Sequence, residues 1–315
     1  MKILITDKTS PKCAQILRDA GFTVDEKFGI SKDELLQIIG NYEGLIVRSA
    51  TKVTADVIAA ARNLKVIGRA GSGVDNIDVQ AATEKGILVM NTPGGNTNAV
   101  AELALLLMLG AARNVYNAVA SLKAHKWEKK KFSGHEIKGK TLGLLGYGRV
   151  SRNLGKKALA LDMQVLCYDP KIKKNLVDED GIQLVADMGT VLSRADYLSV
   201  HLTKKPETIN FISDDEFAQM KDGVFFINCS RGGIVNEKAL LNALNEGKVA
   251  MAAVDVYEKE PPEDFALIDH PNVICTPHIG ASTKEAQENV AVMIAEQFVD
   301  FFTGKGIRNA VNQVG

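Results

Sequence analysis

The chain of 315 residues has few cysteines and no excess of charge of either sign. Its four cysteines, Cys13, Cys167, Cys229 and Cys275, stand far apart, which fits neither a disulfide framework nor a zinc site. Three of them lie in or beside apolar runs, so we expect buried thiols in a reducing compartment.

The positive and negative charges of the chain are balanced. Lysine plus arginine and aspartate plus glutamate both number 38. No overall field would therefore attract nucleic acid or an acidic membrane, and an anionic ligand must be held locally.

A hydrophobic run long enough to cross a membrane is also missing. The longest run, 99–112, contains Glu102 and is too short. The N-terminus leads directly into an apolar strand pattern without the features of a signal peptide. We therefore expect a cytoplasmic protein with no membrane partner. With 46% hydrophobic and 24% charged residues, the chain can bury a large core and is long enough for two domains.

Apolar strand patterns alternate with helical patterns along the chain. In the first part we expect strands at 2–6, 22–26, 45–47, 66–67 and 87–90. In the second part we expect strands at 141–145, 164–168, 197–202, 224–228, 250–256 and 273–275. This alternation predicts an α/β fold with two doubly wound parallel-sheet (Rossmann-like) domains and a cleft between them.

Two long helical patterns mark the expected domain boundaries. The turn at 93–96 interrupts the alternation and precedes a helix expected over 99–123. A final helix over 284–302 is too long for a short crossover, so we expect it to return to the first domain. The substrate-binding domain is then discontinuous, comprising 1–95 and 286–315, and the dinucleotide-binding domain comprises 96–285.

A glycine turn between two strands carries the clearest functional signal. Gly146 and Gly148 permit a tight turn and let the backbone approach a pyrophosphate at the N-terminus of the next helix. Asp169 ends the following strand roughly 20 residues later, where a carboxylate can accept hydrogen bonds from an adenosine ribose. The glycine turn alone would also suit an ordinary α/β sheet. Together with the strand, the helix and the acid, it predicts a dinucleotide site.

The acid favours NAD as the cofactor, because the 2′-phosphate of NADP would meet a like charge. Nearby lysines at 171, 173 and 174 soften that repulsion. Ser151 replaces the third glycine of the motif, and we expect a slight displacement with binding retained. The candidate cofactor contacts are Gly146, Gly148, Arg149, Val150, Asp169, His201, Cys229, Asp255 and Gly280.

Three polar side chains follow apolar strands in the second part of the chain. Arg231, Glu260 and His278 come after the strands at 224–228, 250–256 and 273–275. Ligands of open α/β sheets lie beyond the carboxyl ends of the strands, so these groups should meet at one edge. Each alone could be a loop ion pair, a solvated acid or an ordinary histidine. Three of them beside a dinucleotide motif favour a catalytic role.

The three residue types suit the oxidation of a hydroxyl group. His278 can take the hydroxyl proton while a hydride leaves the same carbon, and Glu260 can orient the imidazole and favour its charged form. Arg231 can bind a substrate carboxylate through two hydrogen bonds. His201, at a strand end of the same edge, is expected to line the cofactor cleft. Asp255 is a candidate acceptor for the nicotinamide carboxamide or a strand-end cap.

These motifs resemble those of the D-2-hydroxyacid dehydrogenase family over essentially the whole chain. The resemblance rests on the glycine turn, Asp169, the segments 229–233 and 254–257, Glu260–Pro261 and the segment 277–280. It implies an arginine, glutamate and histidine catalytic set, NAD-linked chemistry and a homodimer joined through the nucleotide domain.

Within this family, the segments 45–54, 68–76, 91–93 and 280–287 resemble the branch that oxidises 3-phosphoglycerate to 3-phosphohydroxypyruvate, the entry to serine biosynthesis. A carboxylate and a phosphate carry more charge than Arg231 can meet, and Arg48 and Arg69, at strand ends of the first domain, can supply the rest. The resemblance further implies that Lys129 reaches the phosphate across a dimer. It also implies a short form without a regulatory domain. The candidate substrate contacts are Arg48, Ser49, Arg69, Gly71, Ser72, Gly73, Asn96 and Lys129.

Two alternative functions remain open at this point. A glyoxylate/hydroxypyruvate reductase or another D-2-hydroxyacid dehydrogenase would keep the catalytic set but would need no phosphate pocket. A binding protein that senses NAD(H) would keep the dinucleotide motif and a similar set of residues without turnover. No metal ligand set is expected.

Overall fold

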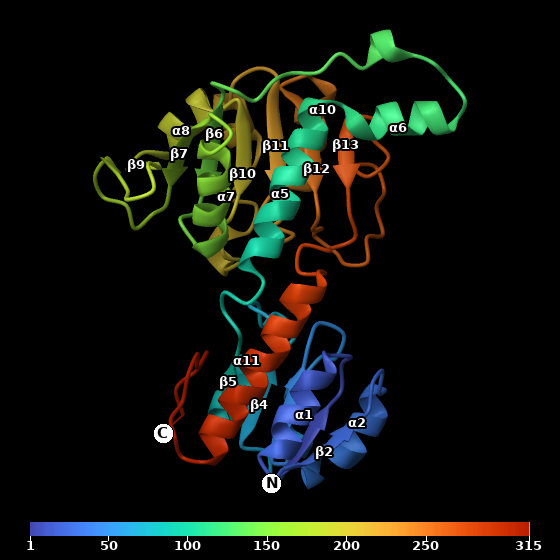
Figure 1. The fold of residues 1–315 in the computed structure, drawn as a ribbon, viewed down its shortest axis with the longest axis vertical. Helices are drawn as coiled ribbons and strands as arrows, with labels where there is room; N and C mark the ends of the chain where they lie inside the picture. The colour runs from blue at the N-terminus through green and yellow to red at the C-terminus, as the bar shows by residue number, and fades with distance from the viewer. Residues whose placement is uncertain (315) are drawn as a thin grey trace. The chain divides into compact units, whose positions relative to one another are not determined.

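The computed structural model describes residues 1–314 and divides the chain into two compact units (Figure 1). The first unit comprises Met1–Thr97 and Ala281–Gly315, and the second comprises Asn98–Gly280. The chain thus passes between these units at 97/98 and 280/281, whereas the sequence analysis expected domain boundaries at 95/96 and 285/286. Each unit is an open α/β sheet with helices on both faces, as the alternating pattern predicts.

The first unit contains a parallel sheet of order β2-β1-β3-β4-β5. Its strands are β1 (Lys2–Ile5), β2 (Thr23–Glu26), β3 (Gly44–Val47), β4 (Val66–Arg69) and β5 (Leu88–Met90). Its helices are α1 (Pro11–Asp19), α2 (Lys32–Ile38), α3 (Ala55–Ala60), α4 (Val79–Glu84) and α11 (Lys284–Phe302), with a 3-10 turn η1 (Ile39–Asn41).

Successive residues of these strands face opposite layers of helices. Ile3 and Ile46 pack with α1 and α11, whereas Leu4 and Leu45 pack with α2, α3 and α4. This follows from the two-residue period of a strand, and it explains why the strands read as continuous apolar runs. The helices α1 and α11 lie side by side on one face (Figure 1).

The end of the chain packs against the first sheet. Asn312 is buried, and its side chain accepts from the N–H of Val89 at 2.7 Å and donates to the carbonyl of Ile87 at 2.9 Å. Ala310 forms an antiparallel bridge with Met90. The expected return of the last helix to the first domain therefore has a specific anchor, which fixes the final segment beside β5.

The second unit contains a sheet of order β13-β12-β11-β10-β6-β7-β9-β8. Its strands are β6 (Thr141–Leu145), β7 (Gln164–Tyr168), β8 (Leu176–Val177), β9 (Gln183–Val185), β10 (Tyr197–Val200), β11 (Val224–Asn228), β12 (Val249–Val254) and β13 (Val273–Cys275). All pairs are parallel except β8 with β9, which form an antiparallel hairpin at one edge. The sequence pattern did not predict this hairpin, because β8 is only two exposed residues long.

The helices of the second unit also cover both faces of their sheet. They are α5 (Thr97–Ala112), α6 (Val115–Lys123), α7 (Arg149–Leu159), α8 (Met188–Arg194), α9 (Asp214–Gln219) and α10 (Glu237–Asn245), with 3-10 turns η2 (Lys129–Lys131) and η3 (Pro206–Thr208). Leu144 and Ile227 pack with α5 and α7, whereas Leu145 and Phe226 pack with α8, α9 and α10.

The prediction of a single helix over 99–123 is wrong, because the structure divides this segment into the two helices α5 and α6. Asn114 takes a left-handed conformation with φ 48°, and the two helices meet at a bend of 69°. Asparagine tolerates this conformation better than most residues. In residues 1–314, no single helix has the length and apolar character of a membrane span; only α5 and α6 taken together meet that description, as a bent pair.

The four cysteines are free thiols, and three of them are buried. Cys275 differs from our expectation, because it is only partly buried. It lines a cavity of about 420 Å³ whose wall also includes Tyr257 and Ile268.

Candidate active site

The glycine turn joins β6 to α7 in the second unit. Gly146 has φ +102°, and a Cβ there would lie 2.7 Å from the carbonyl oxygen of His201, so no other residue fits without displacing the segment that follows β10. A Cβ at Gly148 would meet nothing within 4 Å, so the space beside the helix start is open. Arg149 and Val150 are the first residues of α7. Their unpaired N–H groups and the helix dipole suit a pyrophosphate there.

Asp169 is fixed at the end of β7 by the neighbouring backbone. Its Oδ2 accepts from the N–H of Tyr147 and its Oδ1 from the N–H of Lys171, both at 3.0 Å. The carboxylate borders a cavity of about 690 Å³, which we call the dinucleotide pocket. Its lining residues are Gly146, Tyr147, Gly148, Asp169, Lys171, Ile172, Lys173, Lys174, Leu176, Leu184, His201, Leu202 and Thr203. Asp169 thus borders this pocket, and its contact with the adenosine ribose stays a prediction.

Ser151, which replaces the third glycine, and the cofactor candidate His201 also border this turn. Ser151 is buried in α7, and its hydroxyl lies 3.9 Å from the sulfur of Cys167, so a small side chain keeps the close packing of helix on strand. His201 lines the pocket, and its Nε2 lies 2.9 Å from the hydroxyl of Ser199. Burial lowers the pKa of His201 to about 4. The imidazole is therefore neutral at pH 7.

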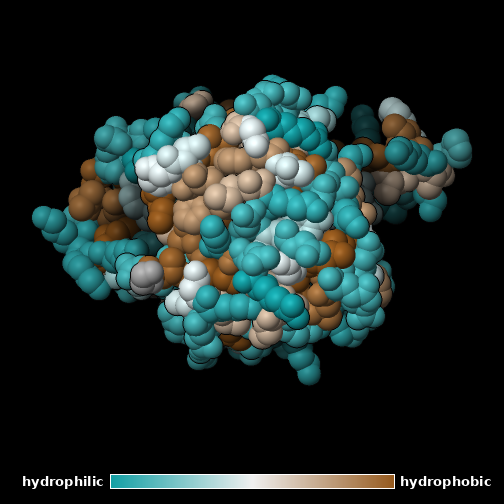
Figure 2. All heavy atoms as spheres, turned by 90° about the horizontal axis from the view of Figure 1, so that it is seen from below, coloured by the Kyte–Doolittle hydropathy of each residue, from teal (hydrophilic) through white to brown (hydrophobic). Residues whose placement is uncertain are grey.

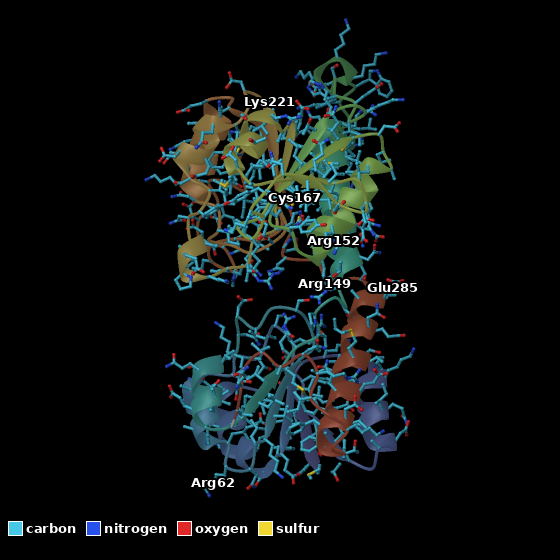
Figure 3. The ribbon with its side chains drawn as sticks, turned by 90° about the vertical axis from the view of Figure 1, so that its left-hand side faces the viewer. Arg62, Arg149, Arg152, Cys167, Lys221 and Glu285 are labelled. Atoms are coloured by element: carbon cyan, nitrogen blue, oxygen red, sulfur yellow. The ribbon has the colours of Figure 1, made fainter. Side chains whose placement is uncertain are left out.

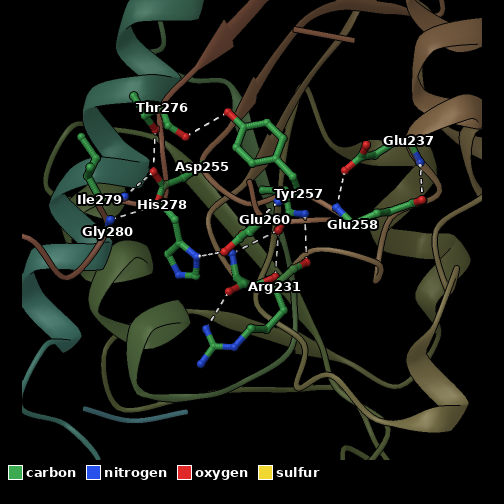
Figure 4. A network of polar contacts seen from close by, with 12 residues as sticks. Arg231, Glu237, Asp255, Tyr257, Glu258, Glu260, Thr276, His278, Ile279 and Gly280 are labelled. Atoms are coloured by element: carbon green, nitrogen blue, oxygen red, sulfur yellow. Dashed lines mark hydrogen bonds and ion pairs between the residues drawn. The ribbon is translucent and has the colours of Figure 1, made fainter. Parts of the chain in front are cut away.

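The side chains of His278 and Glu260 are hydrogen-bonded to each other. The Nδ1 of His278 lies 2.6 Å from the Oε2 of Glu260, and Glu260 Oε1 accepts from the N–H of Tyr257 at 3.1 Å (Figure 4). Partial burial by itself raises the pKa of Glu260, but His278, the Tyr257 N–H and the charge of Arg231 outweigh it and hold the pKa below its ordinary value. Glu260 is therefore a carboxylate that can orient the ring and stabilise an imidazolium.

Asp255 holds the loop that carries His278. Its Oδ1 accepts from the Thr276 hydroxyl at 2.6 Å and the Ile279 N–H at 2.8 Å, and its Oδ2 accepts from the Gly280 N–H at 2.8 Å. These bonds surround His278, whose backbone has the left-handed φ of 52°. The sequence left two roles open for Asp255. The hydrogen bonds to Thr276, Ile279 and Gly280 fit the role of a cap at the end of the strand. A contact with the nicotinamide stays a prediction.

Arg231 comes from the loop after β11, the neighbour of β12 in the sheet. Its Nη1 donates to the carbonyl of Ser230 at 2.8 Å, and its charge acts on Glu260. The next residue, Gly232, packs directly on the loop that carries Glu260, because a Cβ there would lie 1.6 Å from the carbonyl oxygen of Tyr257. Figure 4 shows Arg231 beside the His278–Glu260 pair, so three loops from adjacent strands meet as the strand-end rule predicts.

Two further candidates of the second unit lie apart from this group. Cys229 is buried in the core under the Arg231 loop, and its burial raises the pKa of the thiol, which is therefore protonated. Lys129 begins the exposed turn η2, after α6.

The arginines expected to bind a phosphate lie on adjacent strands of the first unit. Arg69 ends β4 and is paired in register with Val47, directly before Arg48. Arg48 donates through Nη1 to the carbonyl of Lys8 at 3.0 Å. The guanidinium of Arg69 fills the space that a side chain at Gly71 would occupy. Two cationic side chains thus stand at the carboxyl edge of one sheet.

The backbone of the Arg48 loop is held by Asp7, which the sequence analysis did not identify. This buried carboxylate accepts from the Arg48 N–H at 2.6 Å, from the Thr51 N–H at 3.1 Å and from the Thr51 hydroxyl at 2.6 Å. Asn76 donates to the carbonyls of Arg48 and Thr51 at 2.8 and 2.6 Å. Asp7 stands two residues after the end of β1, so the strand-end rule also applies to it.

The remaining substrate candidates belong to the same unit. The hydroxyl of Ser72 donates to Asn96 Oδ1 at 2.8 Å, and Asn91 Nδ2 donates to the carbonyl of Ser72 at 2.6 Å. Gly73 is partly buried next to Ser72, and Ser49 is exposed beside Arg48. These bonds give the 71–73 loop a defined conformation.

Other residues around the catalytic pair were also missed by the sequence analysis. The hydroxyl of Tyr257 donates to the Thr276 carbonyl at 2.9 Å, which ties the Glu260 loop to the His278 loop. Glu237 and Glu258 accept from each other's backbone N–H groups at 2.6 and 3.2 Å. Bonds of this kind depend on loop conformation, so no sequence pattern indicates them. Within residues 1–314 there is no group of three or more His, Cys, Asp or Glu residues placed to hold a metal ion.

Comparison with known proteins places this site in a family. Residues 105–280 match the model described as D-isomer specific 2-hydroxyacid dehydrogenase, NAD binding domain. A D-3-phosphoglycerate dehydrogenase of Archaeoglobus fulgidus is 50% identical over 313 residues, which are 99% of this chain and 59% of that protein. The chain thus spans about three fifths of the length of the curated relatives that it matches.

Solved structures with the same architecture include two members with different stated activities. A glyoxylate reductase from Paecilomyes thermophila has a TM-score of 0.88 at 31% identity and covers 98% of this chain and 97% of its own. An NAD⁺-bound 3-phosphoglycerate dehydrogenase from Entamoeba histolytica has a TM-score of 0.84 at 29% identity and covers 100% and 99%. The family model spans more than half of the chain and includes the glycine turn, Asp169 and all three catalytic candidates. The chain therefore belongs to the D-isomer specific 2-hydroxyacid dehydrogenase family and contains its NAD-binding domain.

Proposed function

We propose that this protein catalyses the NAD-dependent oxidation of 3-phosphoglycerate to 3-phosphohydroxypyruvate, the first step of phosphorylated serine biosynthesis. The observation that carries the chemistry is the 2.6 Å contact between His278 and Glu260 beside Arg231 in the NAD-binding unit. The relatives named D-3-phosphoglycerate dehydrogenase, 50% identical over nearly the whole chain, support the choice of substrate.

The side chains of the second unit divide the work of the reaction. Arg231 binds the substrate carboxylate and thereby orients the carbon that carries the hydroxyl. Nε2 of His278 takes the hydroxyl proton, and Glu260 stabilises the imidazolium that forms. The start of α7 would hold the pyrophosphate of NAD and Asp169 its ribose, and the bound cofactor would supply the hydride acceptor. A base placed in this way contributes on the order of 10² to 10⁴ in rate.

The first unit supplies the features that suit a phosphorylated acid. A phosphate next to a carboxylate needs more positive charge than Arg231 provides, and Arg48 and Arg69 stand on adjacent strands. The loop of Arg48 is fixed by Asp7 and Asn76, which reduces the cost of ordering it around an anion. An unphosphorylated 2-hydroxy acid, as in a glyoxylate reductase or D-lactate dehydrogenase, would need neither arginine.

Steady-state kinetics of Arg48→Ala test the phosphate assignment. We expect kcat/KM for 3-phosphoglycerate to fall by about 10-fold or more, because a bond between charged groups is lost, while the KM for NAD is unchanged. Arg62→Ala is the matched control, since Arg62 carries the same charge but lies in the exposed segment that precedes β4, at the opposite end of that strand (Figure 3). Unchanged turnover in Arg48→Ala would show that the phosphate is bound elsewhere.

The alternative function, a sensor of NAD(H), predicts a different result for the wild-type protein. Tight NADH binding without turnover of any 2-hydroxy acid would support that alternative.

We also propose that two copies associate through the second unit. Helix α6 has no buried residue, and its apolar side chains Val115, Tyr116, Val119 and Leu122 are 46–59% exposed. The helix projects from the body of its unit (Figure 1), and apolar atoms are visible on this segment at the right of Figure 2. An apolar stripe at helical spacing on a projecting helix suits burial against a second copy. In this dimer, Lys129 would reach the substrate phosphate of the other copy.

Light scattering on a Val119→Asp/Leu122→Asp variant tests the association. We expect the wild type to be a dimer and the variant a monomer, whereas Leu161→Asp, a change at another exposed leucine of the same unit, should remain dimeric. A dimeric double variant would exclude α6 as the interface.

Kinetics of lysine variants test the phosphate contact of Lys129. Lys129→Ala should raise the KM for 3-phosphoglycerate more than Lys130→Ala does, and equal KM values in the two variants would remove Lys129 from the site.

A further inference from the structure

Tyr147 stands between the two glycines of the turn, at a place where the motif makes no demand on the side chain. Its backbone N–H donates to Asp169, the acid expected at the ribose, at 3.0 Å. Its hydroxyl donates to the carboxylate of Asp178 in the turn of the β8–β9 hairpin. The guanidinium of Arg152 lies over its ring, 5.3 Å from the centroid. One residue thus connects the glycine turn, the ribose acid and the hairpin.

The hairpin depends on such contacts for the position of its outer strand. Its outer strand has only two residues, Leu176 and Val177, which are 42% and 63% exposed, and it pairs with β9 alone at the edge of the sheet. The inner strand β9 is anchored by its pairing with β7 and by the buried side chains of Leu184 and Val185. A strand of two exposed residues is marginally stable by itself, so contacts of the turn decide where β8 and the chain leading into it lie.

Asp178 organises the turn of this hairpin. Its Oδ1 accepts from the N–H groups of Asp180 and Ile182 at 3.0 and 2.8 Å, and its other oxygen accepts from Tyr147. Burial alone raises the pKa of Asp178, but the Tyr147 hydroxyl and the two N–H groups hold the pKa below its ordinary value. On α7, Arg152 also pairs with Glu179 at 3.0 Å. The carboxylate of Asp178 is therefore charged, and both of its oxygens accept hydrogen bonds.

The chain leading into this hairpin forms a wall of the dinucleotide pocket, which Lys171, Lys174 and Leu176 line together with Tyr147 itself. We infer that the hydrogen bond from Tyr147 to Asp178 fixes this wall against the glycine turn, and that both are positioning residues for the adenosine half of NAD. Because the contact lies at the adenosine end of the pocket, it sets cofactor affinity and leaves the chemistry at His278 untouched. The Tyr147 side chain thus has a function at a position where the glycine motif specifies no residue type.

Binding measurements on Tyr147→Phe test this inference, because phenylalanine keeps the ring under Arg152 and removes only the hydroxyl. We expect the Kd for NADH and for ADP-ribose to rise in parallel by about 10-fold, because binding would then have to order the wall that this hydrogen bond holds in place. The Kd for nicotinamide mononucleotide, which lacks the adenosine half, should not change. Asp178→Ala, whose side chain cannot bond to the tyrosine hydroxyl, should reproduce the effect, and the double variant should bind no more weakly than Asp178→Ala alone, because both changes remove the same contact.

Tyr42 provides a matched control in the first unit. Its hydroxyl donates to Asp25 at 2.7 Å, so Tyr42→Phe removes a similar pair outside the NAD-binding unit and should leave NADH affinity unchanged. Wild-type NADH affinity in Tyr147→Phe would overturn the inference. So would an equal loss for nicotinamide mononucleotide, or an equal loss in Tyr42→Phe, because either would indicate general destabilisation. These binding measurements do not depend on which 2-hydroxy acid is the substrate.

Discussion

The partly buried imidazole of His201 makes the stability of the protein depend on pH in a calculable way. Burial lowers its pKa from 6.5 to about 4, so the folded chain binds the proton less well than the unfolded chain does. The folded pKa lies below the unfolded one, and His201 therefore favours the folded state above pH 6.5 and loses this contribution as the pH falls towards 4. Between pH 7.5 and 5.0 the loss amounts to about 2 kcal/mol.

Urea-induced unfolding at these two pH values measures the effect. In His201→Gln the side chain stays polar but cannot be protonated, so we expect the loss of unfolding free energy on acidification to be about 2 kcal/mol smaller than in the wild type. Ser199→Ala serves as the control: it removes the partner at 2.9 Å but leaves the imidazole buried, and burial is the cause of the shift. Its pH dependence should therefore match the wild type. Equal pH dependence in His201→Gln and the wild type would refute the reasoning.

Two other substitutions probe the catalytic loops. His278→Gln removes the base, so kcat should fall on the order of 10² to 10⁴ while the Kd for NADH stays within about twofold, and normal turnover in steady-state assays would remove His278 from this role. In Gly232→Ala, the added Cβ overlaps the Tyr257 carbonyl at 1.6 Å and must displace the loop of Glu260. We expect a loss of about 1–3 kcal/mol in thermal unfolding together with a lower kcat/KM, and wild-type values for both would contradict the packing described for Gly232.

Much of the fold follows from the sequence because both sheets, apart from the antiparallel β8, are parallel and buried on both faces. Strands such as 141–145 and 224–228 are uninterrupted apolar runs, and the structure places β6 and β11 at those residues. The break between α5 and α6 was missed, because the residues on both sides of Asn114 favour a helix and only its left-handed backbone separates them. The β8–β9 hairpin was missed because an exposed strand of two residues has no apolar pattern.

The candidate site was predictable to the extent that a general rule about strand ends applies. That rule identified Arg231, Glu260 and His278, which lie together, and it applies equally to Asp7, which was overlooked. Contacts such as that of Tyr147 with Asp178 could not be predicted from the sequence, because they join loops whose conformations depend on the packing of the whole unit. The cleft between the two domains and the individual substrate contacts stay predictions.

The initial rate of NADH formation with NAD and 3-phosphoglycerate, compared with glycerate and lactate under the same conditions, tests the central claim most directly. We expect kcat/KM for 3-phosphoglycerate to exceed the other two by about 100-fold or more, because only this substrate engages the two arginines at the ends of β3 and β4. A preference for glycerate or lactate would contradict the assignment.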